Sequence, residues 1–295
     1  MFIIFLWVLG NTLSDQNSFT QWLEWIPTIL IVLWFFVIAV ISCIKQTWRE
    51  ASIASVLWLV LLGWYVGVEN KLFTNCKDTG ELKLVAWTMS HPKKEFASQS
   101  AATIINMDAD ITVLTHGWYV RGEPAIQEWL GSSGEKLIRG TFTVLSKLKP
   151  IKIRTLIASD GIHISSFKLD AQKELGKSLV IWAIDLPSEF SKPRFRTAMI
   201  AKRLLEEIEK EPPDIVAGDF NMTRGSYAME YLFPKMRHAA DDCGCGLLAS
   251  YPRAFPIYHI DHILLNSTLK AVSYHLHNPS IGRHRIQVCK INNAD

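Results

Sequence analysis

The chain has 295 residues, of which 49% are apolar and 20% charged, so it can bury a sizeable core and is not a disordered protein. Its formal net charge of +3 is too small to indicate a nucleic-acid-binding protein. Many of its 11 Trp fall in the first 64 residues, and Trp gathers where membranes meet water. The composition therefore indicates a membrane segment and then a globular part, with the change near residue 70.

Two uncharged apolar stretches follow one another near the N-terminus. Residues 25–44 form a stretch of 20 and residues 51–68 a stretch of 18. As a helix, each is long enough to cross a hydrocarbon core of about 30 Å, and neither has the polar face of a soluble helix. We predict two membrane spans, so the lipid bilayer is a predicted partner. The apolar start, residues 1–13, is shorter and leaves a third span as an alternative.

A short basic loop between the two spans predicts their orientation. It contains Lys45 and Arg49, and short loops with such residues prefer the cytoplasmic side. The hairpin then returns the chain to the other side, although Lys71 beyond the second span works against this orientation. We predict a multi-pass membrane protein with an anchor over residues 1–69 and an extracytoplasmic domain over residues 70–295.

Four cysteines lie beyond the predicted spans: Cys76, Cys243, Cys245 and Cys289. An even number in an oxidising compartment favours a disulfide. The Cys-Gly-Cys segment offers metal binding as an alternative, but it has no second cysteine pair beside it. We therefore prefer a disulfide from one of its cysteines to a distant partner.

Strand and helix patterns alternate along the rest of the chain. Strands are predicted at residues 82–88, 111–114, 142–148, 152–159, 162–169, 179–186, 214–220, 259–266 and 285–291, the last two being the final strands. Helices are predicted at residues 96–110, 123–134 and 194–210, the last with an apolar stripe and a solvated basic face. The mixture indicates a layered α/β domain.

The segment Gly218-Asp219-Phe220-Asn221 ends a predicted buried strand. Positions 219 and 221 are two apart, so on a strand both side chains leave on the same side, and Phe220 points into the core. Six segments in order, "VAWTMS", "DADITVLTHG", "VIWAIDLPS", "GDFN", "IDHILL" and "GRHRIQV", resemble the endonuclease/exonuclease/phosphatase superfamily. The resemblance covers residues 82–292 and implies a four-layered α/β sandwich. Two mixed sheets flanked by helices would follow the N-terminal transmembrane helical hairpin.

The resemblance implies hydrolysis of phosphate esters with a divalent metal, Mg²⁺ or Mn²⁺, by in-line attack of water on phosphorus. It assigns catalytic roles to four residues. Asp219 would align or deprotonate the water, and Asn221 would hold a phosphate oxygen. His284 would contact the phosphate, and Asp261 would orient that imidazole.

Four positions depart from the family pattern. Thr88 replaces an Asn, His116 a metal-binding Glu, Asp185 a His, and Arg283 an acid. Mg²⁺ prefers oxygen ligands, so an imidazole at position 116 favours a softer ion such as Mn²⁺ or Zn²⁺, with Asp219 as the other predicted ligand. Asp185 and Arg283 are predicted to bind substrate, Arg283 through a fixed positive charge against the phosphate.

These departures leave two functions open. One is a membrane-anchored hydrolase that cleaves phosphodiesters or phosphomonoesters. The other is a catalytically degenerate domain that binds phosphorylated ligands without hydrolysis, since a fold does not guarantee an activity. The substrate class stays open between lipid, nucleic acid and nucleotide. Plainer roles also stay open: His116 could end a strand, Asp185 could form a turn, and Arg283 could pair with Asp261.

Overall fold

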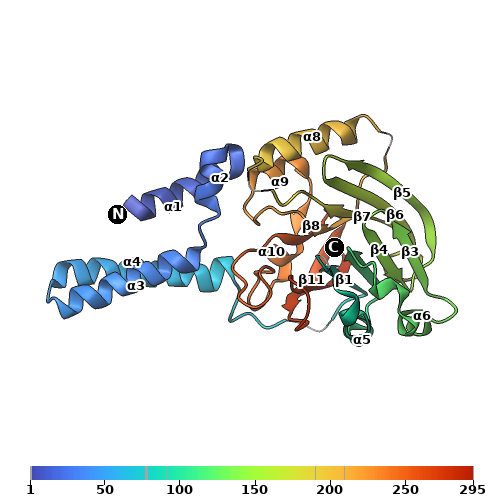
Figure 1. Ribbon diagram of the computed structural model, residues 1–295, viewed down its shortest axis with the longest axis horizontal. Coiled ribbons are helices and arrows are strands. Elements are labelled where there is room, and N and C mark those ends of the chain that lie inside the picture. Colours follow the sequence, from blue (N-terminus) through green and yellow to red (C-terminus); the bar gives the residue numbers. More distant parts are fainter. Residues whose placement is uncertain (1, 77–78, 91, 190, 209, 295) are drawn as a thin grey trace.

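The computed structural model describes residues 2–76, 79–90, 92–189, 191–208 and 210–294. A group of N-terminal helices precedes an α/β domain with two six-stranded sheets (Figure 1). The N-terminal elements are α1 (Phe2–Leu13), the short turn η1 (Ser14–Gln16), α2 (Ser18–Glu24), α3 (Thr28–Ile44), α4 (Trp48–Trp64) and a π turn, η2 (Tyr65–Glu69), which continues α4.

The first sheet has the strand order β11-β12-β1-β2-β4-β3. Only the β1–β2 pair is parallel among its paired strands. Helices α5 (Ala97–Met107) and α6 (Pro124–Leu130) pack on its outer face around Ile104 and Ile126. The strands are β1 (Leu82–Thr88), β2 (Ile111–Thr115), β3 (Glu135–Arg139), β4 (Phe142–Ser146), β11 (Leu269–His277) and β12 (Ile286–Asn293).

The second sheet has the strand order β5-β6-β7-β8-β10-β9, and its β7–β8 pair is parallel. Helices α8 (Arg194–Glu206) and α9 (Tyr227–Leu232) cover its outer face. The strands are β5 (Pro150–Ser159), β6 (Ile162–Ala171), β7 (Lys177–Asp185), β8 (Ile215–Asp219), β9 (Arg237–His238) and β10 (Asp261–Leu265). Two short helices, α7 (Gln172–Leu175) and α10 (Ala239–Cys243), complete the domain.

The main core lies between the two sheets. Leu84 and Val113 of the first sheet share one buried cluster with Phe167 and Ile181 of the second. Burying each side chain of this kind contributes about 1.5–3 kcal/mol. The prediction of two mixed sheets flanked by helices is confirmed.

Several details of the sequence prediction were wrong: strands β3 and β9 were not predicted, and α6 ends at Leu130, short of the predicted residue 134. Residues 259–266 contain β10 and residues 285–291 overlap β12, so strands are present at both places. They are not the last two strands, however, because β11 lies between them. β11 is an edge strand whose polar residues weaken its apolar pattern. Helix α8 ends at Glu206, short of the predicted residue 210, and α5 ends at Met107, where Asp108 takes a left-handed conformation with φ 44°.

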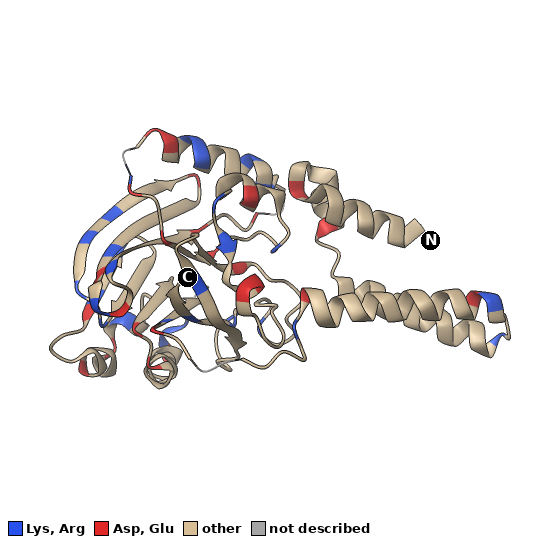
Figure 2. Cartoon of the chain, turned by 180° about the vertical axis from the view of Figure 1, so that it is seen from behind, with Lys and Arg blue, Asp and Glu red and all other residues tan. Residues whose placement is uncertain are grey.

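The N-terminal helices have the apolar character expected of the predicted spans. Among the described residues, the continuous helix Trp48–Glu69, 22 residues long, is long and apolar enough to cross a membrane. The pair α2 and α3, bent by 62°, meets that criterion only if counted as one span. Figure 2 shows α3 and α4 uncharged along their middle, with charges at their connecting end.

The start of the first predicted span needs correction. Residues 25–44 do not form one helix, because Pro27 occupies the N-cap position and α3 begins at Thr28. Proline favours a helix start and cannot continue a preceding helix. Trp25 therefore lies outside both helices and packs on Tyr258 of the α/β domain, with the ring centroids 5.0 Å apart.

Polar side chains fix the N-terminal helices to the α/β domain. Asp15 accepts hydrogen bonds from the backbone N–H of Ala228, at 2.9 Å, and from the Ser226 hydroxyl, both at the start of α9. Gln21 accepts the backbone N–H of Arg194, the first residue of α8, at 2.7 Å. Unpaired N–H groups at a helix start need such acceptors. These contacts join the two predicted units, residues 1–69 and 70–295.

A disulfide joins Cys76 to Cys245, whose Cα atoms are 5.6 Å apart. The preference for a disulfide between the Cys-Gly-Cys segment and a distant partner is therefore confirmed. Cys243, the other cysteine of that segment, is free.

Gly218 has a backbone conformation that other residues rarely adopt, with φ 143°. A Cβ atom there would lie 2.0 Å from the carbonyl oxygen of Ile184 on β7. We expect Gly218→Ala to lower the free energy of unfolding by more than about 4 kcal/mol. Each kcal/mol lowers the melting temperature of a domain of this size by about 2–4 °C. Thermal melts of the full chain in detergent check this. Gly225→Ala, with open space around its Cβ position, is the matched control, and equal melts for the two variants would contradict the expectation.

Candidate active site

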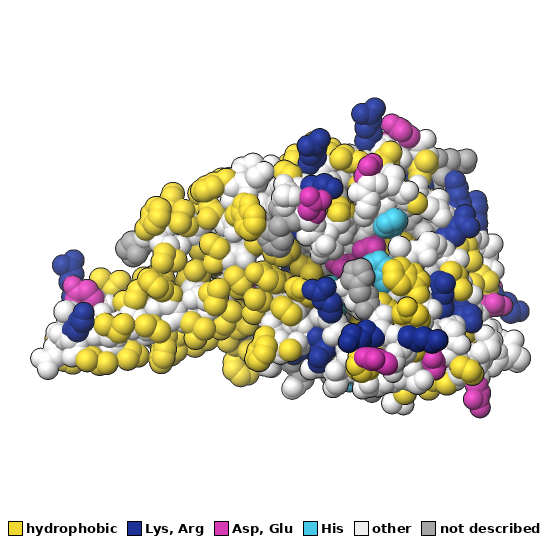
Figure 3. All heavy atoms as spheres, in the orientation of Figure 1, with side chains coloured by type: hydrophobic (Ala, Val, Ile, Leu, Met, Phe, Trp, Pro, Cys, Tyr) yellow, Lys and Arg dark blue, Asp and Glu magenta, His cyan; other side chains and the backbone are white. Residues whose placement is uncertain are grey.

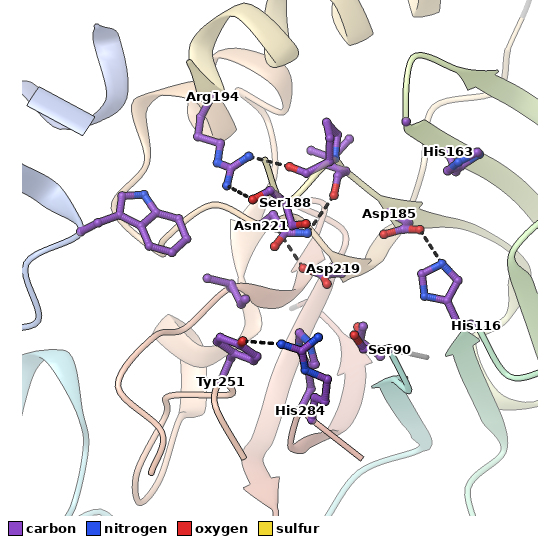
Figure 4. A pocket seen from close by; sticks show the side chains of 17 residues that line it. Ser90, His116, His163, Asp185, Ser188, Arg194, Asp219, Asn221, Tyr251 and His284 are labelled. Atoms are coloured by element: carbon purple, nitrogen blue, oxygen red, sulfur yellow. Dashed lines mark hydrogen bonds and ion pairs between the residues drawn. The ribbon is translucent and has the colours of Figure 1, made fainter. Parts of the chain in front are cut away.

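A pocket of about 420 Å³ opens where β1, β2, β7 and β8 end (Figure 4). Strand register decides which side chains meet there. Asp185 is paired with Asp219 across the parallel strands β7 and β8, and Asp219 with Asp261 across β8 and β10. Three carboxyl groups therefore lie in a row at the edge of the second sheet.

His284 and Asp261 form a buried pair beside this row. His284 Nδ1 lies 2.8 Å from Asp261 Oδ2, and the Thr88 hydroxyl donates to Asp261 Oδ1. Burial alone would lower the pKa of His284, but the charge and hydrogen bond of Asp261 outweigh it and raise that pKa to about 9. His284 is therefore a cation at neutral pH. Asp261 lies where it would orient the imidazole.

Asp219 lies at the floor of the pocket, at the end of β8. Its Oδ1 accepts the backbone N–H of Asn221 at 3.0 Å. Burial, and then the charge of Asp261, raise the pKa of Asp219 well above its ordinary value. A buried carboxylate with a raised pKa is a better proton acceptor than an exposed one.

Asn221 reaches the same pocket by a different route from the one predicted. Strand β8 ends at Asp219, so a shared strand face does not apply. Asn221 instead adopts a left-handed conformation with φ 49°, which Asn tolerates better than most residues. Its side-chain amide donates to the Leu186 carbonyl oxygen at 2.8 Å. Phe220, between them, is buried in the core as predicted.

Two departures from the family pattern contact each other. His116 follows β2 and lines the pocket, and its Nε2 lies 3.1 Å from Asp185 Oδ2. The imidazole that replaces a Glu thus pairs with the carboxylate that replaces a His. Arg283 lies at the exposed rim and donates to the Tyr251 hydroxyl at 2.9 Å. The alternative in which Arg283 forms an ion pair with Asp261 was therefore wrong.

Sequence reasoning missed several pocket residues, among them Trp25, Arg194 and Tyr251. The prediction of a solvated basic face was wrong for Arg194, which is almost fully buried. Its guanidinium donates to the carbonyl oxygens of Pro187 and Ser188 and so holds the loop after β7. Trp25 and Tyr251 come from connecting segments that carry no periodic pattern, so the sequence offered no signal for them.

The row of carboxyl groups, Asp185, Asp219 and Asp261, offers candidate ligands for a metal ion. Asp219, Asp261 and His284 bring ligand atoms within 4.8 Å of one another. Both oxygens of Asp261 already take part in hydrogen bonds, however, to Thr88 and to His284. Asp219 and Asp185 lie on adjacent strands, with His116 beside Asp185. Two carboxylates and one imidazole fit Mn²⁺ or Zn²⁺ better than Mg²⁺.

No family model and no curated protein matches this sequence. Solved structures do match the α/β domain. One is an endonuclease/exonuclease/phosphatase from Bacteroides vulgatus, with a TM-score of 0.54 and 15% identity over 72% of this chain and 99% of that chain. Another is humanized D. rerio TDP2, with a TM-score of 0.53 and 16% identity over 72% of this chain and 98% of that chain.

A third similar structure is a mannosyl-6-phosphatase from Bacteroides thetaiotaomicron, with a TM-score of 0.52 and 11% identity over 71% of this chain and 99% of that chain. Each match spans nearly the whole of the other chain, so the shared part is a complete domain. At these identities the similarity concerns the fold. The α/β domain of this chain therefore has the fold of the endonuclease/exonuclease/phosphatase proteins.

Proposed function

We propose that this chain is a membrane-anchored hydrolase of phosphate esters. The observation that carries the proposal is the buried Asp261–His284 pair beside Asp219 in one pocket. A fixed cation next to a buried base is what hydrolysis of a phosphate ester needs. Arg283 adds a second positive charge at the rim. The similar structures, one of them a mannosyl-6-phosphatase, support phosphate-ester chemistry on this fold.

In the proposed reaction a water oxygen attacks phosphorus opposite the leaving ester oxygen. A P–O bond to the water oxygen forms, and the P–O bond to the ester oxygen breaks. Asp219 accepts one proton of the water, and the departing oxygen takes up a proton from solvent. His284, kept protonated by Asp261, stabilises the charge that builds on the phosphate oxygens. Asn221 donates an amide hydrogen to one of them.

A divalent cation belongs to the proposal. Asp219, Asp185 and His116 would hold it, and when bound it would neutralise part of the phosphate charge. The contact between His116 and Asp185 supports a test in which the two family residues are restored together.

His116→Glu alone would replace the imidazole with an oxygen ligand and leave three carboxylates at the metal site. We expect it to shift preference towards Mg²⁺, raising Mg²⁺ affinity by about tenfold, the effect usual for a metal-site partner. The double change His116→Glu with Asp185→His should do less, because it keeps two carboxylates and one imidazole and only exchanges the positions that now form the 3.1 Å pair. Titration calorimetry with Mg²⁺ and Mn²⁺ measures this. Unchanged preference in His116→Glu would contradict the assigned ligands.

The function is tested with the full chain in detergent micelles. We expect hydrolysis of bis(p-nitrophenyl) phosphate or p-nitrophenyl phosphate in at least one of Mg²⁺, Mn²⁺ and Zn²⁺. Comparing the two substrates shows whether the chain hydrolyses phosphodiesters or phosphomonoesters. No turnover with any metal, together with saturable binding of a phosphorylated ligand, would instead support the catalytically degenerate binding domain.

We also propose that α3 and α4 cross the bilayer and leave the α/β domain extracytoplasmic. The exposed apolar side chains of both helices support the anchor, among them Leu33, Trp34 and Val60. The Cys76–Cys245 disulfide supports an oxidising compartment, and the basic Lys45–Arg49 loop supports a cytoplasmic turn. A reporter enzyme that folds only outside the cytoplasm, fused after the last residue, should be active. Activity only of a cytoplasmic reporter would contradict this orientation.

A further inference from the structure

We propose that the phosphate ester cleaved in this pocket is a membrane lipid, whose headgroup enters from the bilayer in which the chain is anchored. This inference rests on the proposed hydrolase function. It follows from the apolar and aromatic side chains that line the pocket together with the acids, from where they come in the chain, and from their closeness to the apolar helices.

The pocket has two chemically different sides. Asp185, Asp219 and His284 form a charged side. Trp25, Leu186, Pro187, Ile260 and Tyr251 provide an apolar and aromatic side, and Trp25, Leu186 and Ile260 are buried. A volume of about 420 Å³ accommodates a phosphate and a small substituent but not acyl chains. The charged side suits the phosphate, and the apolar side suits the first carbon atoms of a lipid.

Trp25 belongs to the N-terminal part of the chain and is firmly held. The Arg194 guanidinium lies 5.6 Å from the centre of its ring, and Tyr258 packs on it at 5.0 Å. The preceding helix α2 is tied to the α/β domain by Gln21 and by a hydrogen bond from the Thr223 hydroxyl to Glu24. The segment that contains Trp25, between α2 and α3, is therefore part of the pocket wall.

The pocket wall lies close to the start of the apolar helix α3. Helix α3 begins at Thr28, three residues after Trp25. Three extended residues span at most about 11 Å. The headgroup layer on each side of a bilayer is about 5–8 Å thick, from a total of 40–45 Å and a core of about 30 Å. The separation of Trp25 from α3 is therefore comparable with the thickness of the headgroup layer, so this part of the pocket wall would lie near the lipid phosphates when α3 is inserted.

Helix α2, which precedes Trp25, exposes aromatic residues. It buries Gln21 and Leu23 and exposes Phe19 and Trp22. Aromatic side chains of this kind gather at membrane interfaces. In Figure 3 apolar side chains cover the hairpin and extend to the edge of the hollow where acidic and histidine side chains are visible. On that face (Figure 3) the apolar surface of the hairpin therefore adjoins the hollow, next to basic side chains.

The test compares two esters with the same reacting group in the full chain. Dioleoylphosphatidyl-p-nitrophenol in nanodiscs presents the diester in a bilayer, and methyl p-nitrophenyl phosphate presents it in water. Nitrophenol release is measured for both, with the chain in the same nanodiscs. We expect kcat/KM to be at least about 100-fold higher for the lipid, because a filled apolar contact gives about 10–200-fold per group.

Trp25→Ala should lower the ratio of lipid to soluble kcat/KM by about tenfold, and Trp25→Phe should restore most of it. Trp34→Ala, an exposed tryptophan on α3 outside the pocket, is the matched control and should leave the ratio unchanged. Turnover of the soluble ester without preference for the lipid would overturn the lipid inference while leaving the hydrolase function intact. An equal loss for both esters in Trp25→Ala would also overturn it. No turnover of either ester would overturn both.

Discussion

Replacing Asp219 with Asn should slow turnover strongly and at the same time stabilise the folded chain. The raised pKa of Asp219 comes from burial and from the nearby charge of Asp261, so the ionised carboxylate destabilises the fold. Asn keeps the oxygen that accepts the backbone N–H of Asn221. We expect a gain of about 0.5–2 kcal/mol, the size usual for relieving a functional site, and a loss of about 10²–10⁴-fold in kcat.

The pH dependence of this gain follows from the direction of the shift. A carboxyl group whose folded pKa is raised binds more protons folded than unfolded, so its penalty grows as pH rises through that pKa. The advantage of Asp219→Asn should therefore be small near pH 4 and larger at pH 7 to 8. Thermal melts in EDTA measure it.

The control for this prediction is Glu128→Gln, an exposed acid of α6 outside the pocket lining, which should leave the melting temperature within a degree or so. Mn²⁺ should stabilise the wild-type chain more than Asp219→Asn, since the variant loses a ligand carboxylate. A lower melting temperature for Asp219→Asn in EDTA would contradict the account of this carboxyl as a destabilising buried charge.

Replacing His284 with Gln should reduce kcat/KM by about 10²–10³-fold, the effect usual for removing one group that stabilises developing charge. The wild-type activity should fall as pH rises through about 9, where His284 loses its proton. The variant should lack that falling limb, because Gln does not titrate. A pH–rate profile of both chains measures this. His277→Gln, a histidine of β11 outside the pocket, is the control and should keep the wild-type profile.

The raised pKa of His284 also predicts how the stability of the fold depends on pH. The pKa of His284 rises from 6.5 to about 9 on folding, so its contribution is fully present below pH 6.5 and is lost as pH rises through about 9. The wild-type melting temperature should therefore fall between pH 7 and 10 more than that of His284→Gln. Equal slopes in the two chains would show that the imidazole is not held as a cation.

The sequence predicted the fold well where order and periodicity carried the information. Strands such as β1 and β7 are continuous apolar runs, and the order of six short segments identified the fold. Edge strand β11 was missed because its polar residues dilute the apolar pattern. Pro27 moved the start of α3, a local effect that an apolar stretch does not reveal.

The site was predicted in part for the same reason. Asp219, Asp261 and His284 belong to motifs, and the structure brings them together. The pairing of His116 with Asp185 depends on two strands in different sheets, which spacing along the chain does not encode. Trp25 reaches the pocket because η1 and α2 dock on the domain through Asp15 and Gln21, long-range contacts that no local pattern predicts.

The most direct test of the central claim is to follow phosphate-ester hydrolysis by the full chain in water enriched in ¹⁸O, with phosphorus NMR of the product. Attack of water on phosphorus predicts that the solvent oxygen enters the phosphate product and is absent from the released alcohol. Turnover should need Asp219 and His284. Absence of product with every metal and ester, or ¹⁸O in the alcohol in place of the phosphate, would contradict the account.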